Sequence, residues 1–210
     1  MKISDVENNK IIAIIRNVYG LKLLRLSEAL SEGGIKAAEV AFGADAGKTI
    51  DAVAELKEFC GPNMFIGAGT VLNGENVRRA AKAGARFIIS PNVSKEVIYA
   101  TRDCGLLSVA GAMTPTEIIE AHSYGADFIK IFPADVLGTA YIRAVKAPFP
   151  DLKFIAASGI TESNIGEYLA AGYSAAGVSG RLADLKLIEK GDFQVITQRA
   201  AAYVKAAKNA

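Results

Sequence analysis

The chain has 210 residues, of which 51% are hydrophobic and 22% are charged, and its formal net charge is +2. This balance is typical of a globular protein of one or two domains, and without a basic run it argues against a nucleic-acid-binding protein. The single histidine argues against a His-based triad or a site of several histidines. No apolar run is long enough to span a membrane. We therefore expect a cytoplasmic protein that binds neither nucleic acid nor a membrane.

Eight short apolar runs recur along the chain, and their starting positions are 20 to 27 residues apart. A helix of about ten residues and two short loops fill such an interval, as a βα unit requires. The runs are Ile11–Arg16, Ala37–Ala41, Met64–Gly67, Arg86–Ser90, Leu106–Ala110, Phe128–Phe132, Phe154–Ala157 and Ala175–Val178.

Helical patterns occupy the intervals between these runs, and a last amphipathic pattern covers Phe193–Ala207. Residues that favour a helix N-cap precede four of the patterns, namely Asn73, Ser94, Thr114 and Thr161. After Thr114 the order Pro-Thr-Glu predicts a capping box, in which the cap and the glutamate bond each other's backbone. The other patterns are Leu21–Leu30, Ile50–Phe59, Val77–Ala83, Lys95–Arg102, Glu117–His122, Tyr141–Val145 and Ile165–Ala171.

Eight βα units without any antiparallel signal predict an α/β fold, a (β/α)₈ TIM barrel. We expect one domain over residues 1–210, with a C-terminal helix added to the barrel. An open, doubly wound sheet is the alternative, but such a sheet usually carries a glycine-rich turn after its first strand. Here the first run ends Ile15-Arg16-Asn17-Val18, without that turn.

Active sites of such barrels lie at the carboxyl ends of the strands. The ends of the eight runs form a polar ring on an apolar barrel. In chain order they are Arg16, Glu39, Thr70, Pro91-Asn92, Gly111-Ala112-Met113, Lys130, Ser158-Gly159 and Ser179-Gly180-Arg181.

Lys130 is the strongest catalytic candidate, because it is the one charge in Phe128-Ile129-Lys130-Ile131-Phe132. Burying an ammonium group is costly unless the charge is paired or the pKa falls, and a neutral amine in an apolar pocket attacks carbonyls to form a Schiff base. If Phe128 points into the barrel, Lys130 does too. The alternative is an outward lysine that extends between helices to reach water.

Glu39 is the single charge of a second buried run and needs a partner, for which Lys130 or Arg16 is the natural candidate. It is either a structural ion-pair partner or a general acid/base near the lysine. The planar fork of Arg16 suits a carboxylate, and the Thr70 hydroxyl could bind the same group. Alternatively, Arg16 is a solvated charge at a strand end and Thr70 is a turn residue.

Ser158-Gly159 and Ser179-Gly180 end the last two strands, where barrels often bind phosphate through backbone N–H groups. Ser-Gly is also ordinary turn chemistry, so the pattern by itself leaves both interpretations open.

Several segments together resemble the 2-keto-3-deoxy-6-phosphogluconate / 4-hydroxy-2-oxoglutarate aldolase family, including its 6-phosphogalactonate branch. The similarity extends through nearly the whole chain. Its main segments are Ile12–Arg16, Glu39-Val40, Ile66–Leu72, Ser90-Pro91-Asn92 and Phe128–Ala134. Gly43 stands where many members of the family have an arginine. The galactonate branch also lacks an arginine at that position and has one at the position of Arg16.

The resemblance implies a (β/α)₈ barrel, usually trimeric, with a class I mechanism that needs no metal and no cofactor. It implies a Schiff base on Lys130 and general acid/base catalysis by Glu39. Arg16 and Thr70 would bind the carboxylate of the keto acid, and Pro91 and Phe132 would line the pyruvyl pocket.

We therefore predict a pyruvate-forming class I aldolase that acts on a 2-keto-3-deoxy-6-phospho sugar acid or on 4-hydroxy-2-oxoglutarate. Two alternatives are a sugar-phosphate isomerase or epimerase on the same fold and a non-catalytic barrel that binds an acidic metabolite. The first would need a metal site or paired carboxylates at the strand ends, where we find only Glu39. The second would bind pyruvate without forming an imine.

Overall fold

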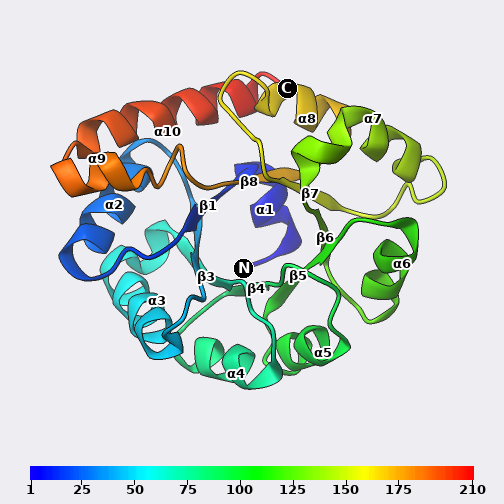
Figure 1. Cartoon of the computed structure of the whole chain (residues 1–210), viewed down its shortest axis with the longest axis horizontal. Helices are drawn as coiled ribbons and strands as arrows, with labels where there is room; N and C mark the ends of the chain where they lie inside the picture. Colours follow the sequence, from blue (N-terminus) through cyan, green and yellow to red (C-terminus); the bar gives the residue numbers. More distant parts are fainter.

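The computed structural model describes residues 1–210 and alternates strands with helices along the chain. Eight parallel strands pair in chain order, and β8 pairs with β1 to close a barrel (Figure 1). This closure confirms the predicted (β/α)₈ barrel over the open sheet. The strands are β1 (Ile11–Ile15), β2 (Ala37–Ala41), β3 (Phe65–Gly69), β4 (Phe87–Ile89), β5 (Leu107–Ala112), β6 (Phe128–Ile131), β7 (Phe154–Ala157) and β8 (Ala175–Val178).

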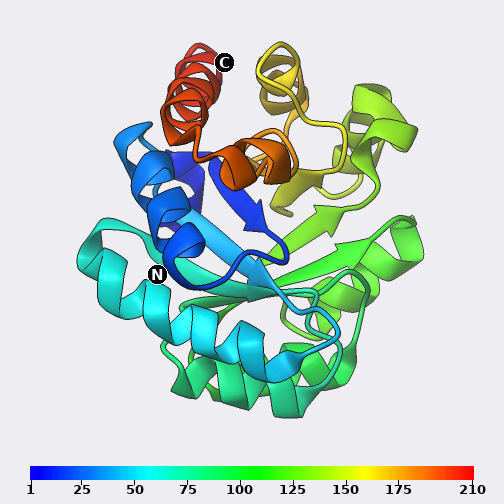
Figure 2. The ribbon, with the colours of Figure 1, turned by 60° about the vertical axis from the view of Figure 1, so that its left-hand side comes forward.

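The helices surround the barrel, as Figure 2 shows from the side. They are α1 (Ile3–Asn9), α2 (Gly20–Glu32), α3 (Ala46–Cys60), α4 (Gly74–Lys82), α5 (Lys95–Asp103), α6 (Pro115–Ser123), α7 (Ala134–Lys146), α8 (Ile165–Ala171), α9 (Leu185–Lys190) and α10 (Phe193–Lys208), with a short 3₁₀ turn at Gly61–Asn63. The predicted C-terminal helix is α10, which packs against α2 and α8. No helix combines the length and apolarity that crossing a bilayer would require.

Two strands extend further toward their carboxyl ends than the sequence predicts. The third run was expected at Met64–Gly67 and forms β3 to Gly69, and the fifth was expected at Leu106–Ala110 and forms β5 to Ala112. The added residues are glycine and alanine, which have weak strand propensity by themselves. They are held by the ladder, because Gly69 pairs with Ala41 and Ala112 pairs with Ile131.

Three of the four predicted N-caps are confirmed. Thr114 Oγ1 accepts a hydrogen bond from the Glu117 N–H at 3.3 Å, and Glu117 Oε2 accepts one from the Thr114 N–H at 2.8 Å, which completes the predicted capping box. Asn73 and Ser94 likewise accept from backbone N–H groups in the first turns of α4 and α5.

The predicted cap at Thr161 is wrong, because α8 begins only at Ile165. Asn164 changes the local structure: its Oδ1 accepts a hydrogen bond from the Thr161 N–H at 2.8 Å. Its Nδ2 donates to the Gly159 carbonyl at 2.9 Å. These two bonds fold residues 159–164 into a turn at the carboxyl end of β7, so this segment belongs to the loops around the barrel mouth.

Helix α1 closes the amino end of the barrel and was not predicted. Its Val6 is buried with Ile12, Phe87 and Phe128 in the cluster that fills the barrel interior. The segment is only seven residues long and mostly polar, so it lacks the apolar periodicity from which a helix is recognised. Its helical form is therefore stabilised largely by the tertiary contact of one apolar face.

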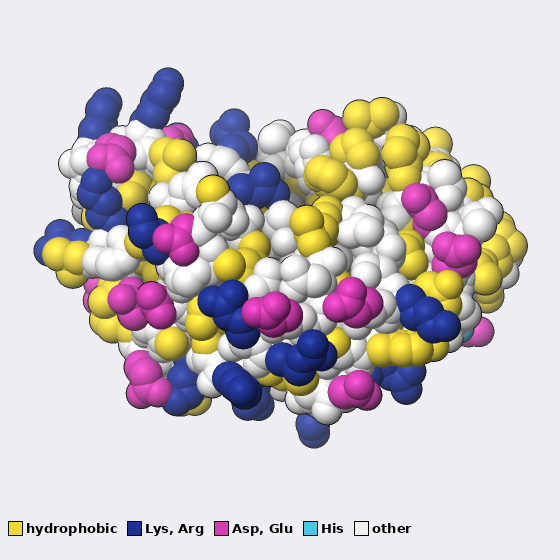
Figure 3. Space-filling model, turned by 60° about the horizontal axis from the view of Figure 1, so that its bottom comes forward, with side chains coloured by type: hydrophobic (Ala, Val, Ile, Leu, Met, Phe, Trp, Pro, Cys, Tyr) yellow, Lys and Arg dark blue, Asp and Glu magenta, His cyan; other side chains and the backbone are white.

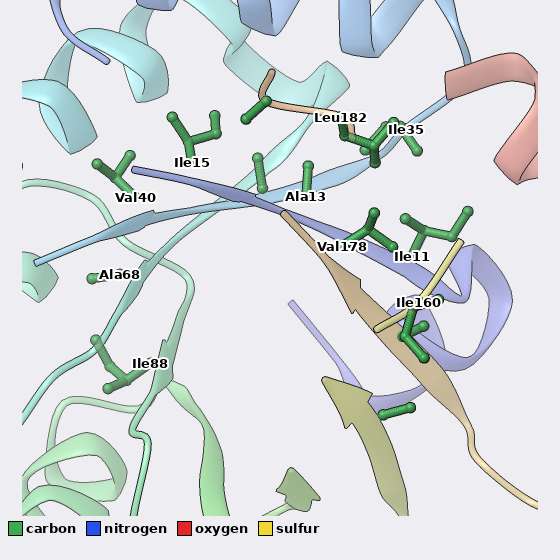
Figure 4. Close-up of a cluster of buried hydrophobic side chains, with 14 of the residues drawn as sticks. Ile11, Ala13, Ile15, Ile35, Val40, Ala68, Ile88, Ile160, Val178 and Leu182 are labelled. Atoms are coloured by element: carbon green, nitrogen blue, oxygen red, sulfur yellow. The ribbon is translucent and has the colours of Figure 1, made fainter. Parts of the chain in front are cut away.

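The hydrophobic core has two parts with different positions. A large cluster lies between the strands and the surrounding helices, and Figure 4 shows part of it, including Ile11, Val40 and Leu182. The second cluster has ten buried residues and fills the interior near the amino ends of the strands. At the carboxyl ends the next inward positions include Glu39, Gly69, Gly111 and Lys130, so the interior there is polar or open.

Candidate active site

Lys130 lies on β6, where Gly111 of β5 and Ile155 of β7 are its partners in the ladder. Phe128, two residues earlier on the same strand, belongs to the cluster inside the barrel. Because side chains alternate along a strand, Lys130 also faces the interior, and only 8% of it is exposed. The alternative of an outward lysine between helices is therefore wrong.

The surroundings of Lys130 disfavour its charged form. Burial lowers the pKa of its ammonium group below 10.5, the nearby Arg16 lowers it further, and the carboxyl group of Glu39 acts in the opposite direction. The Nζ atom lies 5.0 Å from the centre of the Phe132 ring. The neutral amine, which is the nucleophilic form, is thus more populated than on a surface lysine.

Glu39 projects from β2 into the same end of the barrel, and it is 2% exposed. Burial raises the pKa of its carboxyl group to about 7, although the positive charges of Lys130 and Arg16 act to lower it. Its Oε2 atom has no hydrogen-bond partner in the protein. A carboxyl group that exchanges protons near neutral pH, with one oxygen free, suits general acid/base catalysis.

Gly69 makes room for this carboxyl group. A Cβ atom built on Gly69 would lie 2.4 Å from Glu39 Cδ and 2.4 Å from its Oε2, which is well inside van der Waals contact. Any larger residue at position 69 must therefore push the Glu39 side chain out of its place.

We expect Gly69→Ala to lower kcat by at least about tenfold and to reduce the free energy of unfolding by about 1–3 kcal/mol, because the added methyl group overpacks the site. Gly166→Ala is the matched control, since a Cβ atom at Gly166 in α8 meets nothing closer than 3.7 Å. Steady-state kinetics and urea denaturation measure the two effects. Unchanged kcat in Gly69→Ala would show that the position of Glu39 is not needed for turnover.

A cavity of about 360 Å³ opens at the carboxyl ends of β6, β7, β8 and β1. Its lining includes Arg16, Lys130 and Phe132, together with both Ser-Gly pairs, Ser158-Gly159 and Ser179-Gly180. The structure thus brings together seven of the ten residues proposed from the sequence. Thr161 and Arg181 also line it. The sequence predicts Arg181 at a strand end without a specific role, and it predicts Thr161 only as a helix cap.

Glu39, Thr70 and Pro91 lie at the same end of the barrel but do not line this cavity. The Pro91 carbonyl packs against β5, where a Cβ atom on Gly111 would lie 2.2 Å from it. Thr70 directly follows β3 and is half-buried. Their proposed contacts with substrate remain predictions.

Backbone strain concentrates around the mouth of the barrel. Three of the four residues other than glycine with positive φ follow strand ends there: Asn17 (φ 55°) after β1, Thr70 (φ 57°) after β3 and Ser158 (φ 86°) after β7. This left-handed conformation costs side chains other than glycine about 1–2 kcal/mol each and is typical of functional sites.

The loops after β7 and β8 present unpaired backbone donors beside the cavity. The N–H groups of Gly159, Ile160, Gly180 and Arg181 donate to no backbone carbonyl. Clustered backbone N–H groups of this kind bind anions. The lining carries the guanidinium groups of Arg16 and Arg181 and the amine of Lys130, and no carboxylate. The cavity is therefore suited to an acidic ligand.

No three His, Cys, Asp or Glu residues lie close enough together to hold a metal ion. His122 lies on α6, away from the barrel mouth, and it is exposed.

Comparison with known proteins gives one consistent result. The family model for KDPG and KHG aldolase matches residues 3–199. The 2-dehydro-3-deoxy-6-phosphogalactonate aldolase of Escherichia coli K12 is 32% identical over 202 residues, which cover 95% of this chain and 95% of the relative. The probable 2-dehydro-3-deoxy-6-phosphogalactonate aldolase of Rhizobium meliloti is 35% identical over 174 residues, covering 82% of this chain and 81% of the relative.

A solved structure with the same fold is that of KDPG aldolase from Legionella pneumophila, with pyruvate captured as a covalent carbinolamine intermediate. Its sequence is 28% identical, its TM-score to this chain is 0.88, and the match covers 97% of this chain and 98% of that one.

Proposed function

The chain belongs to the KDPG and KHG aldolase family, and we propose that Lys130 is the residue on which its chemistry takes place. The protein is a class I, pyruvate-forming aldolase, an aldehyde-lyase that works through a Schiff base. The observation that supports Lys130 is its position: it is a buried amine with a lowered pKa, and it lines the cavity under the influence of Glu39 and Arg16.

In the proposed mechanism the neutral Lys130 amine attacks the C2 carbonyl of a 2-keto-4-hydroxy acid and forms a carbinolamine. Loss of water gives an iminium ion, which can accept the electron pair of the C3–C4 bond. Glu39, acting through a water molecule, removes the proton of the C4 hydroxyl group as that bond breaks. An aldehyde leaves, and the enamine of pyruvate is protonated at C3 and hydrolysed to release pyruvate and the amine.

Binding of the carboxylate is assigned to Arg16 and Thr70, and the pyruvyl pocket to Pro91 and Phe132. Two observations support the role of Arg16: it lines the cavity, and its positive charge acts to lower the pKa values of both Lys130 and Glu39. A guanidinium there offers the paired donors that a carboxylate accepts. It also holds the keto group beside the amine, which supplies orientation rather than new chemistry.

We further propose that the substrate is phosphorylated and that Ser158-Gly159 and Ser179-Gly180 bind its phosphate. Two observations support this: these loops line the cavity, and the N–H groups of Gly159 and Gly180 are not used by the fold. Two relatives with this substrate class in their names are matched over most of their length.

A pyruvate-release assay tests these proposals. The substrates are the two phosphorylated 2-keto-3-deoxy sugar acids, their unphosphorylated forms and 4-hydroxy-2-oxoglutarate. We expect pyruvate from the phosphorylated acids at a kcat/KM at least about tenfold higher than from the others, since a charged distal group adds roughly 1.5–3 kcal/mol of binding. Equal rates would argue against a phosphorylated substrate. Tight pyruvate binding without turnover of any substrate would indicate the binding barrel, and pyruvate release that a chelator abolishes would contradict the metal-free mechanism.

The resemblance also supports the proposal that the protein acts in the cytoplasm as a homotrimer. Four apolar side chains near the barrel mouth and on α6 and α7 are exposed, namely Met113, Ile119, Phe132 and Val136, the last at 70%. Figure 3 shows a face on which hydrophobic side chains gather toward one side, whereas charges of both signs are mixed elsewhere. Light scattering measures the mass directly, and a value corresponding to one chain would contradict the trimer.

A further inference from the structure

Arg181 is a cation of the cavity wall that the mechanism above does not use. It follows the Ser179-Gly180 pair at the end of β8, and its side chain is half exposed. Arg16 and Lys130 lie on the β1 and β6 sides of the same cavity. If Arg16 and Lys130 bind the keto-acid end of the substrate, Arg181 is the remaining positive side chain for the distal end.

The guanidinium group of Arg181 is held in place between the last two loops. Its Nη2 atom donates to Glu162 Oε1 at 2.5 Å, which connects the end of β8 to the turn after β7. Hydrogen bonds, including the one from Arg181, keep the pKa of Glu162 low although burial acts to raise it, so the carboxylate remains charged. The Arg181 side chain therefore connects the two loops, after β7 and β8, that we propose bind the phosphate.

Most of the donors of this guanidinium remain free. An arginine side chain has five N–H groups, of which one donates to Glu162 and another lies within reach of the Tyr203 hydroxyl. Its backbone N–H and that of Gly180 are also unpaired, so one loop offers side-chain and backbone donors together. A phosphate monoester has three acceptor oxygens and two charges, and it can accept more of these bonds than a carboxylate or a hydroxyl group can.

We propose that Arg181 is a specificity-determining residue, whose guanidinium binds the phosphate monoester at the distal end of the substrate. The proposal rests on the proposed aldolase function and refines it. The backbone N–H groups of the two loops can donate to any anion that fits. The guanidinium group of Arg181 adds the contact that distinguishes phosphorylated from unphosphorylated substrates.

The test compares Arg181→Ala with the wild-type enzyme on a phosphorylated 2-keto-3-deoxy acid and on the same acid without phosphate. We expect kcat/KM to fall by about 10- to 100-fold for the phosphorylated acid and by less than about threefold for the other, because only the first loses a charge-assisted bond. Inorganic phosphate should inhibit the wild-type enzyme competitively. Its inhibition of Arg181→Ala should be weaker by at least about tenfold. Arg181→Lys keeps the charge but loses the fork, so it should lie between the two.

Lys22→Ala is the control for loss of a surface cation, since Lys22 also pairs with a glutamate, Glu189, and its side chain is 50% exposed compared with 52% for Arg181. Lys22→Ala should leave kcat/KM for both acids and the inhibition by phosphate unchanged. Equal losses on both acids, or no loss on either, would overturn the assignment of Arg181, as would a loss confined to 4-hydroxy-2-oxoglutarate.

Trapping of pyruvate by borohydride separates failure of this proposal from failure of the proposed function. Pyruvate has no distal group, so wild type and Arg181→Ala should be labelled equally. A wild-type protein that is not labelled contradicts the aldolase mechanism itself, whereas equal labelling without a difference between the substrates contradicts only the role of Arg181.

Discussion

Lys130→Ala should reduce kcat/KM for pyruvate release by about four orders of magnitude or more, because the variant has no amine to form the iminium ion. Borohydride added with pyruvate should attach one reduced pyruvyl group to the wild-type protein, on the peptide that contains Lys130. Mass spectrometry of the intact protein and of its peptides measures this adduct. The same treatment should leave Lys130→Ala without a label.

Lys153→Ala is the matched control for this experiment. Lys153 forms an ion pair with Glu7 of α1, at the opposite end of the barrel, so its loss should change neither labelling nor turnover. A pyruvyl label that persists in Lys130→Ala at the wild-type level would place the Schiff base on another lysine. Turnover that persists without any label would rule out a class I mechanism.

Glu39→Gln should slow turnover by about 10²- to 10⁴-fold, because the amide cannot accept the proton of the C4 hydroxyl group. Imine formation with pyruvate should fall much less, since that step depends mainly on the neutral amine of Lys130. The two rates are measured separately, by steady-state pyruvate release and by the rate of borohydride trapping. Equal reductions in both would instead favour a structural ion pair between Glu39 and Lys130.

The raised pKa of Glu39 also predicts how stability depends on pH. Its carboxyl group binds a proton more tightly in the folded chain, with a pKa of about 7, than at its ordinary value of 4.5. The resulting stabilisation is fully present below pH 4.5 and is lost as the pH rises through about 7. The unfolding free energy of the wild-type protein should therefore fall relative to that of Glu39→Gln over this range, by up to about 3 kcal/mol. Urea denaturation at several pH values measures it, and a constant difference would contradict the raised pKa.

The same ionisation of Glu39 should affect activity in the opposite direction. Glu39, as the proposed general base, must be ionised, so kcat/KM of the wild-type enzyme should rise as the pH increases through about 7. We therefore expect opposite effects of the same ionisation, a loss of stability and a gain of activity, as the pH rises through about 7. Such opposing effects are common where active sites bury charged groups.

The sequence by itself determined the fold and singled out Lys130 as the residue proposed to react. The eight apolar runs and the helical patterns between them are local, periodic features, and one domain of alternating βα units has few ways to bury them. Lys130 could be singled out for the same reason, since one charge inside a short apolar run must either be satisfied or be reactive. The family resemblance rests on segments of this kind, and the comparisons support it.

The tertiary structure decided what depends on residues far apart in the chain. Neighbours on a strand cannot show that Gly69 leaves space for the Glu39 carboxyl group, because the two lie on different strands. The pair between Arg181 and Glu162 joins two loops, and the polar α1 becomes a helix by closing the barrel. Strand periodicity fixes which side of the sheet a residue faces, whereas barrel closure fixes which strand ends meet. For this reason the sequence could single out the lysine that we propose reacts, but only the folded chain shows which groups share its cavity.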